Sequence, residues 1–136
     1  MIRSIIKDPV FLSQSSARAT AADRAIADDL RDTLFAHRDA CVGMAANMIG
    51  EHKRVIIFLD GNTPTVMFNP EIVSADGEFE TEEGCLSLTG TRHTKRCSRI
   101  RVRFQDERFV RRTREYEGWT AQIIQHEIDH CNGVLI

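Results

Sequence analysis

The first regular pattern in the chain is a helical one. Residues 20–23 resemble a capping box with Asp in place of Glu, and after them Ile26, Leu30 and Leu34 recur four residues apart. Residues with this spacing share one face of an α-helix, and charged side chains occupy the opposite face here. The pattern predicts a first helix of about five turns that ends near Ala40.

The middle of the chain has the patterns of β-strands. Residues 54–60 are rich in β-branched and aromatic side chains, Asp-Gly-Asn at 60–62 is a turn signal, and residues 65–68 supply a second strand. We therefore expect a hairpin. In residues 99–104 arginines alternate with Ile, Val and Phe, which predicts a half-buried strand with an arginine face. Asp and Glu at 106–107 then turn the chain back.

A second helical segment runs from about Trp119 to Cys131 and is followed by Asn132 and Gly133, residue types that end helices. Together these patterns predict an α+β fold, with mostly antiparallel short strands around this C-terminal helix and one N-terminal helix. The 136 residues are 42% hydrophobic and 28% charged and contain no internal repeat or linker, which is typical of a single domain over residues 1–136.

Composition argues against several classes of protein. The longest apolar run, residues 55–59, is far too short to cross a bilayer, and the N-terminus has no recognisable secretory leader. We therefore expect a cytoplasmic protein that does not bind membranes. The formal net charge of −2 argues against a strongly basic nucleic-acid-binding protein, so we expect no sequence-specific nucleic-acid partner.

The charges are nevertheless unevenly distributed. Residues 55–91 contain no Lys or Arg, whereas residues 92–114 contain ten of the eighteen basic residues. The interpretation that we prefer is solvated strand faces. The alternative is a ribosome- or RNA-associated protein that contacts phosphates through residues 92–114, although this segment has few aromatic side chains on which bases could stack.

The candidate chemistry lies in the last helix, in the sequence HEIDH at residues 126–130. Residues four apart share a helix face, so the imidazoles of His126 and His130 can bind one metal ion. Glu127 follows the first of these histidines and is placed to act as a general base on a metal-bound water.

Two imidazoles leave such a site incomplete, which directs attention to the four cysteines. They form no C-x-x-C pair and are too few for a disulfide scaffold, so a reducing compartment fits them best. Cys85, which follows the flexible Gly84, is the best candidate for a third ligand, with core packing or a free thiol as the alternatives. Cys41, Cys97 and Cys131 are predicted to be small packed residues.

Three segments resemble the signature motifs of the peptide deformylases. They are EGCLS at residues 83–87, HEIDH at 126–130, and CVGMAANMIG at 41–50, which aligns with the family pattern G-x-G-L-A-A-P-Q-I-G. Their order and separations also fit, and the resemblance covers essentially the whole chain. It implies an enzyme that removes the formyl group from the N-terminal formylmethionine of new polypeptides and releases formate. It also implies one divalent metal ion per chain, usually Fe²⁺ in the cell, with Zn²⁺ or Ni²⁺ often found after purification.

The resemblance assigns roles to individual residues. Cys85, His126 and His130 would be the metal ligands, with water in the fourth position. Glu127 would take the proton of that water and deliver it to the leaving amine. The backbone N–H of Leu86 would donate to the developing oxyanion.

The same resemblance implies a substrate-binding set. Gly43 would bind the substrate backbone with Met44 beside it, and Arg92 matches a family arginine that helps to order the site. Gln122, one helical turn before His126, stands where family members usually present an apolar pocket residue. The implied partner is an N-formylmethionyl peptide, and a transient association with the ribosome is a further expectation.

One motif position departs from the family pattern. Met48 occupies the place of a glutamine whose side chain normally donates to the formyl oxygen, and a thioether cannot donate a hydrogen bond. Three explanations compete: the amide of Asn47 substitutes for the missing donor, the amide of Gln122 faces the site, or the protein is a weakened or inactive deformylase that keeps its metal and binds peptide N-termini. Because the water-activating set is intact, we favour retained activity.

Overall fold

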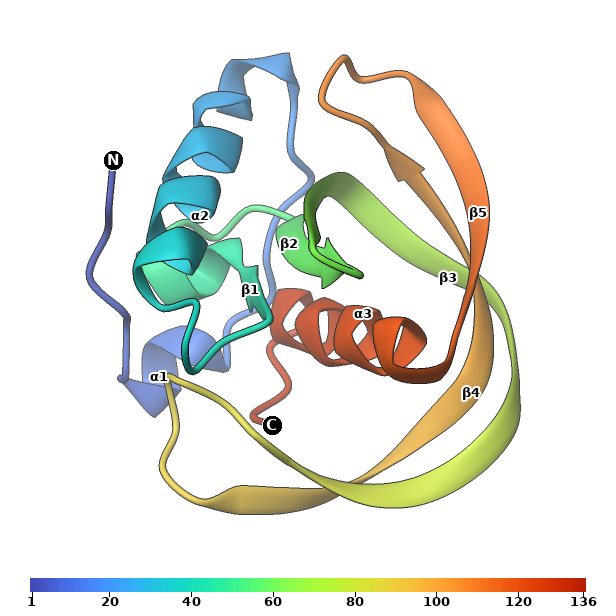
Figure 1. Cartoon of the computed structure of the whole chain (residues 1–136). Helices are drawn as coiled ribbons and strands as arrows, with labels where there is room; N and C mark the ends of the chain where they lie inside the picture. The colour runs from blue at the N-terminus through green and yellow to red at the C-terminus, as the bar shows by residue number, and fades with distance from the viewer.

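The computed structural model describes residues 1–136 as one curved antiparallel sheet with helices packed on both of its faces (Figure 1). The strand order follows the chain, β1-β2-β3-β4-β5. The strands are β1 (Gly43–Ala45), β2 (Val55–Asp60), β3 (Thr63–Gly84), β4 (Thr91–Gln105) and β5 (Arg111–Glu117). The helical elements are α1 (Pro9–Leu12), η1 (Ala21–Asp23), α2 (Ala25–Ala36), η2 (Ala46–Ile49) and α3 (Gly118–Cys131). The predicted α+β class is confirmed.

The first predicted helix is shorter than its pattern indicated. The backbone N–H of Thr20 donates to the carboxylate of Asp23, 2.8 Å away, but this cap begins the 3₁₀ turn η1 rather than the α-helix. The α-helix α2 then has 12 residues and ends at Ala36, because residues 37–40 form a succession of turns. The predicted end near Ala40 was therefore wrong by about one helical turn.

Both predicted strand patterns are present. Asp60 pairs with Thr63 across a two-residue turn in which Gly61 has φ 63, a backbone conformation that favours glycine. The strand with the arginine face is part of β4, and residues 106–110 turn the chain into β5. β3 extends to Gly84, well beyond the predicted residues 65–68.

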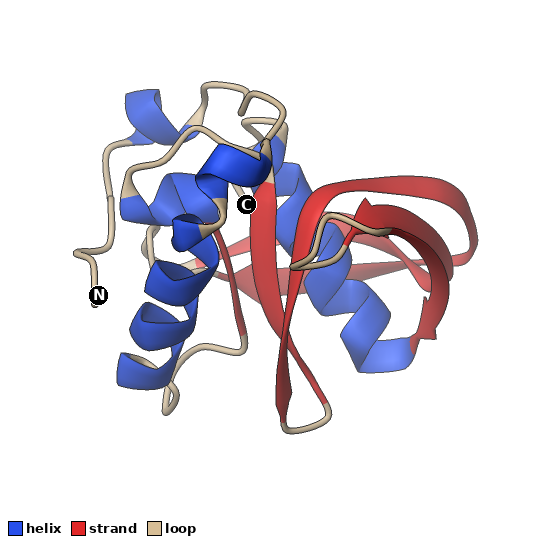
Figure 2. Cartoon of the chain, turned by 90° about the horizontal axis from the view of Figure 1, so that it is seen from above, coloured by secondary structure: helices blue, strands red, loops and turns tan.

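Strand β2 separates two hydrophobic clusters. Val55 and Ile57 pack toward α2 with Leu30, whereas Ile56 and Phe58 pack toward α3. Such a strand is buried on both faces, which explains its uninterrupted apolar sequence. The views in Figures 1 and 2 agree that α3 lies in the concave side of the curved strands, with α2 on the other side of β2.

The uneven charge distribution of the sequence has a structural reason in the β3–β4 hairpin. The acidic residues of β3 lie across from the basic residues of β4, as in the ion pairs between Glu71 and Arg103 and between Glu78 and Lys95. Arg101 pairs with Glu115 of β5 in the same way. The two charged segments are thus cross-strand partners on an exposed surface.

None of the helices has both the length and the apolar character that a membrane crossing requires.

Candidate metal centre

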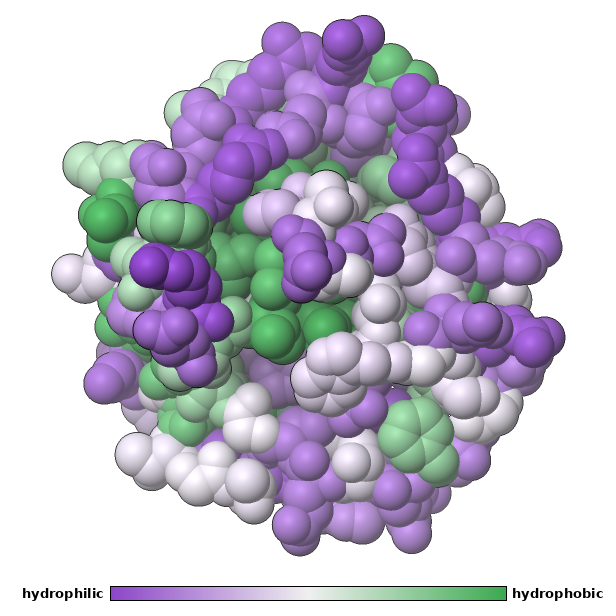
Figure 3. Space-filling view, viewed as in Figure 1, coloured by the Kyte–Doolittle hydropathy of each residue, from purple (hydrophilic) through white to green (hydrophobic).

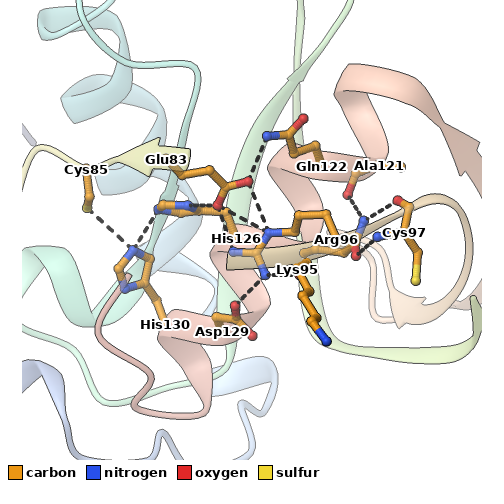
Figure 4. Close-up of polar contacts among 11 residues, drawn as sticks. Glu83, Cys85, Lys95, Arg96, Cys97, Ala121, Gln122, His126, Asp129 and His130 are labelled. Carbon is orange, nitrogen blue, oxygen red and sulfur yellow. Dashed lines mark hydrogen bonds and ion pairs between the residues drawn. The ribbon is translucent and has the colours of Figure 1, made fainter. Parts of the chain in front are cut away.

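Helix α3 places the two histidines of the HEIDH motif in the interior of the protein. Both imidazoles are buried, and their Nε2 atoms lie 3.1 Å apart because residues four apart share a helix face (Figure 4). The side chains project from the face of α3 that looks toward the loop between β3 and β4.

That loop brings Cys85 to the histidines. Its Sγ lies 3.4 Å from Nε2 of His130, and the backbone N–H of Ser87 donates to the same sulfur over 3.4 Å. The ligand atoms of Cys85, His126 and His130 all lie within 4.8 Å of one another. The structure therefore brings the three predicted ligands together, from segments more than 40 residues apart.

The hydrogen bonds around His126 test whether these atoms suit a cation. A carboxylate can only accept, so Nδ1 of His126, 2.8 Å from Oε1 of Glu83, carries the proton of that bond. Once the ring is neutral, its Nε2 has a free lone pair with which it can bind a metal ion. Two imidazole Nε2 atoms and a thiol sulfur then face one point. Tetrahedral coordination with metal–nitrogen bonds of about 2.0 Å separates two nitrogens by roughly 3.3 Å, close to the observed spacing. The donor set fits a divalent transition metal.

The two histidines differ in how readily they bind a proton. Burial alone would lower the pKa of His126, but its bonds to Cys85 and Glu83 outweigh burial and raise the pKa to about 10. Burial and the neighbouring charge of His126 lower the pKa of His130 to about 3. A metal ion bound here therefore competes with a proton held mainly at His126.

Glu83 is the centre of a buried network that holds His126. Arg96, only 5% exposed, donates to both carboxylate oxygens of Glu83 and, over 2.7 Å, to Asp129. Gln122 donates to the same carboxylate over 2.8 Å. Burial alone would raise the pKa of Glu83, but these bonds and the one from His126 lower it to about 2. The carboxylate stays ionised and fixes the ring of His126.

The sequence analysis missed this network. Glu83 and Asp129 lie inside the two quoted motifs, two residues before Cys85 and one before His130, and that placement was an available signal. Arg96 gave no signal, because nothing in the sequence distinguishes it from the nine other basic residues of segment 92–114.

Glu127 is the acid–base candidate beside the metal ligands. It is buried, and its Oε1 has no hydrogen-bond partner. Burial raises the pKa of its carboxyl group to about 7. A carboxyl group with a pKa near neutrality can both take and return a proton.

A cavity of 480 Å³ opens beside this cluster and is lined by Glu83, Cys85, Gln122, His126 and Glu127, among others. Its walls include residues 40–43 at the start of β1, Met48 of η2, residues 82–86, and residues 119, 122, 123, 126 and 127 of α3. Apolar side chains gather in the hollow at the centre of Figure 3, over the place where β1 and β2 meet α3 in Figure 1. The lining residues with polar or reactive groups are Cys41, Glu82, Glu83, Cys85, Gln122, His126 and Glu127.

Several predicted site residues lie at this cavity. Gly43 lines it so closely that a Cβ there would lie 2.8 Å from Oε2 of Glu127. Leu86 lines it, and its backbone N–H makes no hydrogen bond within the protein. Gln122 also lines it, with its NH₂ group directed to Glu83.

Three predicted site residues are not brought to the cavity. The side chain of Met44 is fully buried in the hydrophobic cluster beneath α2. Asn47 points away and donates to the backbone carbonyl of His130, so its amide is not available as the substitute donor, which was one of the three explanations for Met48. Arg92 lies opposite Glu83 in the β3–β4 pairing with a buried, unpartnered Nη1, and Arg96 makes the site contacts instead.

The chain matches one protein family over nearly its whole length. The family model described as polypeptide deformylase matches residues 2–136. A peptide deformylase of Clostridium beijerinckii is 49% identical over 136 residues, which is 100% of both chains. Peptide deformylase 2 of Prochlorococcus marinus is 41% identical, over 91% of this chain and 66% of that protein.

Solved structures give the same result for the fold. The crystal structure of a peptide deformylase from Legionella pneumophila is similar with a TM-score of 0.89 and 35% identity, covering 99% of this chain and 83% of that one. A Met-Ala-Ser-bound class I type b peptide deformylase from Acinetobacter baumannii has a TM-score of 0.89 at 27% identity, covering 99% of this chain and 97% of that one.

Proposed function

The chain belongs to the polypeptide deformylase family, and from this membership we propose which of its residues carry out the family's reaction. It is a metal-dependent hydrolase that removes the formyl group from the N-terminal formylmethionine of polypeptides and releases formate. The observation that carries the assignment of residues is the convergence of two Nε2 atoms and one sulfur on a point beside a buried carboxyl group.

We propose that Cys85, His126 and His130 hold the metal. When bound, the ion supplies an activated water molecule and polarises the formyl carbonyl. Glu83 keeps the proton of His126 on Nδ1, so that Nε2 is available as a ligand. The N–H of Ser87 stabilises the thiolate of Cys85 in the same site.

Glu127 moves the protons of the reaction. It takes one proton from the attacking water as the carbon–oxygen bond forms, and it gives that proton to the amine as the carbon–nitrogen bond breaks. Its pKa of about 7 suits both steps near neutral pH. The free N–H of Leu86 donates to the oxyanion that develops on the formyl oxygen, and Gly43 lets the substrate backbone approach Glu127.

The substrate is a formylmethionyl peptide that occupies the 480 Å³ cavity. We assign Gln122 to its wall, because this residue lines the cavity while its amide is held by Glu83. Met44 and Arg92 do not line this cavity, so we assign neither of them a contact with the substrate.

The chemistry of the chain also bears on its resident metal, its place in the cell and its further partners. We propose Fe²⁺ as the resident metal in the cell because membership of the family implies it, and a thiolate with two imidazoles would also bind Zn²⁺ or Ni²⁺. The four cysteines are free, which fits the cytoplasm, where new polypeptides are made. Transient binding to the ribosome stays a prediction, and ion pairs already engage Arg101 and Arg103 of the basic segment.

The assignment is tested with the variant Glu127→Gln. We expect wild-type protein purified without oxygen to hold about one metal ion per chain and to release formate from formyl-Met-Ala-Ser. The variant should keep the metal and release formate at least about a thousandfold more slowly, since both proton transfers are lost. Equal rates for the two proteins would overturn the role of Glu127. Cys85→Ser, which removes a ligand, should lose the metal itself.

A further inference from the structure

Asn47 is a buried amide that joins three segments of the chain next to the metal centre. It lies in η2 and is completely buried. Its Nδ2 donates to the backbone carbonyl of His130 over 3.0 Å and to that of Leu12 over 3.4 Å. The side chain thus connects η2, the end of α1 and the last turn of α3.

The hydrogen bond from Asn47 to the carbonyl of His130 lies at the C-terminal end of α3. The last carbonyl groups of a helix have no partner within it, and the carbonyl of His130 is one of these. It accepts from the backbone N–H of Gly133 over 3.1 Å and from Asn47. Both lone pairs of this carbonyl are therefore used, which fixes the residue that carries the second imidazole.

The same contact also bears on where the imidazole lies. His130 turns Nε2 toward Cys85 and His126, 3.4 and 3.1 Å from the facing atoms. A shift of the backbone at His130 would move this nitrogen away from the other two proposed ligand atoms.

We propose that Asn47 is a positioning residue for His130: its Nδ2 anchors the backbone carbonyl of His130 and thereby fixes the residue whose Nε2 binds the metal. The inference rests on the proposed function, because it requires His130 to be a ligand. It also gives this motif position a purpose, since the side chain of the family's proline could not supply this donor.

The experiment measures metal affinity directly. Metal-free wild type and Asn47→Leu, a change of similar volume that removes both polar atoms, are titrated with Co²⁺ against a chelator, and their absorption spectra and unfolding in urea are recorded. We expect Asn47→Leu to bind Co²⁺ about 10- to 100-fold more weakly, with an altered spectrum, as is usual when a partner of a ligand is lost. In formate release, kcat should fall at a nearly constant KM.

A matched control separates positioning from stability. Thr33 is also completely buried and accepts one hydrogen bond, from the backbone N–H of Arg3 over 2.9 Å, but it lies in α2 and does not line the cavity. Thr33→Val should lower stability and leave the Co²⁺ affinity and spectrum as in wild type.

The inference is overturned if folded Asn47→Leu binds Co²⁺ as tightly as Thr33→Val, with the wild-type spectrum. If the metal-free leucine variant does not fold, Asn47→Ala, which introduces no bulk, is measured in its place with the same expectation. Failure of the proposed function gives a different result: His130→Ala would then bind Co²⁺ as tightly as wild type.

Discussion

Nδ1 of His126 lies 2.8 Å from Oε1 of Glu83, a residue 43 positions earlier in the chain. The bond links the end of β3 to the middle of α3, and Arg96 of β4 holds the carboxylate from the other side. One buried ion pair thus orients His126, which we propose as a metal ligand, and ties the helix to the hairpin that carries Cys85.

Removal of Arg96 should therefore damage both stability and metal binding. Arg96→Met removes the guanidinium partner of the buried Glu83 carboxylate and of the partly exposed Asp129, and we expect it to lower the free energy of unfolding by about 3–5 kcal/mol in urea titrations. Arg101→Met is the control, because its ion pair with Glu115 is exposed and should contribute about 1 kcal/mol or less. Similar losses for the two variants would contradict the role of the network.

A glutamine at position 48 should increase turnover. Met48 lines the cavity and cannot donate a hydrogen bond, and one missing oxyanion donor typically costs about a hundred- to a thousandfold in kcat. Met48→Gln should recover a large part of this factor in formate release from formyl-Met-Ala-Ser. An unchanged rate would mean that another group already donates, and Gln122→Leu in the wild-type background would then reduce kcat.

The absence of a side chain at Gly43 should be essential for activity. A Cβ at this position would lie 2.8 Å from Oε2 of Glu127 and 2.9 Å from Cγ2 of Ile123. Gly43→Ala should displace Glu127 and reduce kcat by about a hundredfold or more, while the circular dichroism spectrum stays that of a folded protein. Gly84→Ala is the control, because the nearest atom to its added Cβ is at 3.5 Å and its φ is not positive. Full activity of Gly43→Ala would show that the site has more room than the contacts indicate.

Glu127 should make the metal-free protein less stable as pH rises. Its pKa is about 7 in the folded protein against 4.5 in an unfolded chain, so the folded state binds more protons between these values. The contribution of Glu127 to the free energy of unfolding is then fully present below about pH 4.5 and is lost as pH rises through 7. Glu127→Gln does not titrate, so its unfolding free energy should exceed that of metal-free wild type by a margin that grows from pH 5 to pH 8. A margin independent of pH would contradict this account. Urea unfolding of wild type and Glu127→Gln at pH 5 and at pH 8 measures this margin.

The parts of the molecule that follow from local patterns could be predicted from the sequence. α3 and its HEIDH motif depend on helical spacing, and the β2–β3 turn depends on Gly61. The outer part of β3 was not predicted, because residues 73–78 are exposed on both faces and include Asp76-Gly77, a pair that is typical of a turn rather than of a strand interior.

The site was predictable only where its residues carry a motif. Cys85 and the two histidines were found in this way, and the structure brings them together. The contact of Asn47 with His130 spans 83 residues and depends on how η2 packs under α3, which no spacing rule describes. Arg96 differs from its basic neighbours only by the burial that the folded hairpin gives it.

The charge pairing of the β3–β4 hairpin has a consequence for synthesis. β3 is translated before β4, so a growing chain carries an acidic strand segment, with Glu71, Glu78 and Glu80, before its basic partner exists. An unpaired strand edge is a template for aggregation, and like charges on two such edges repel each other. We therefore expect the carboxylates that later pair with β4 to keep neighbouring unfinished chains apart by charge repulsion.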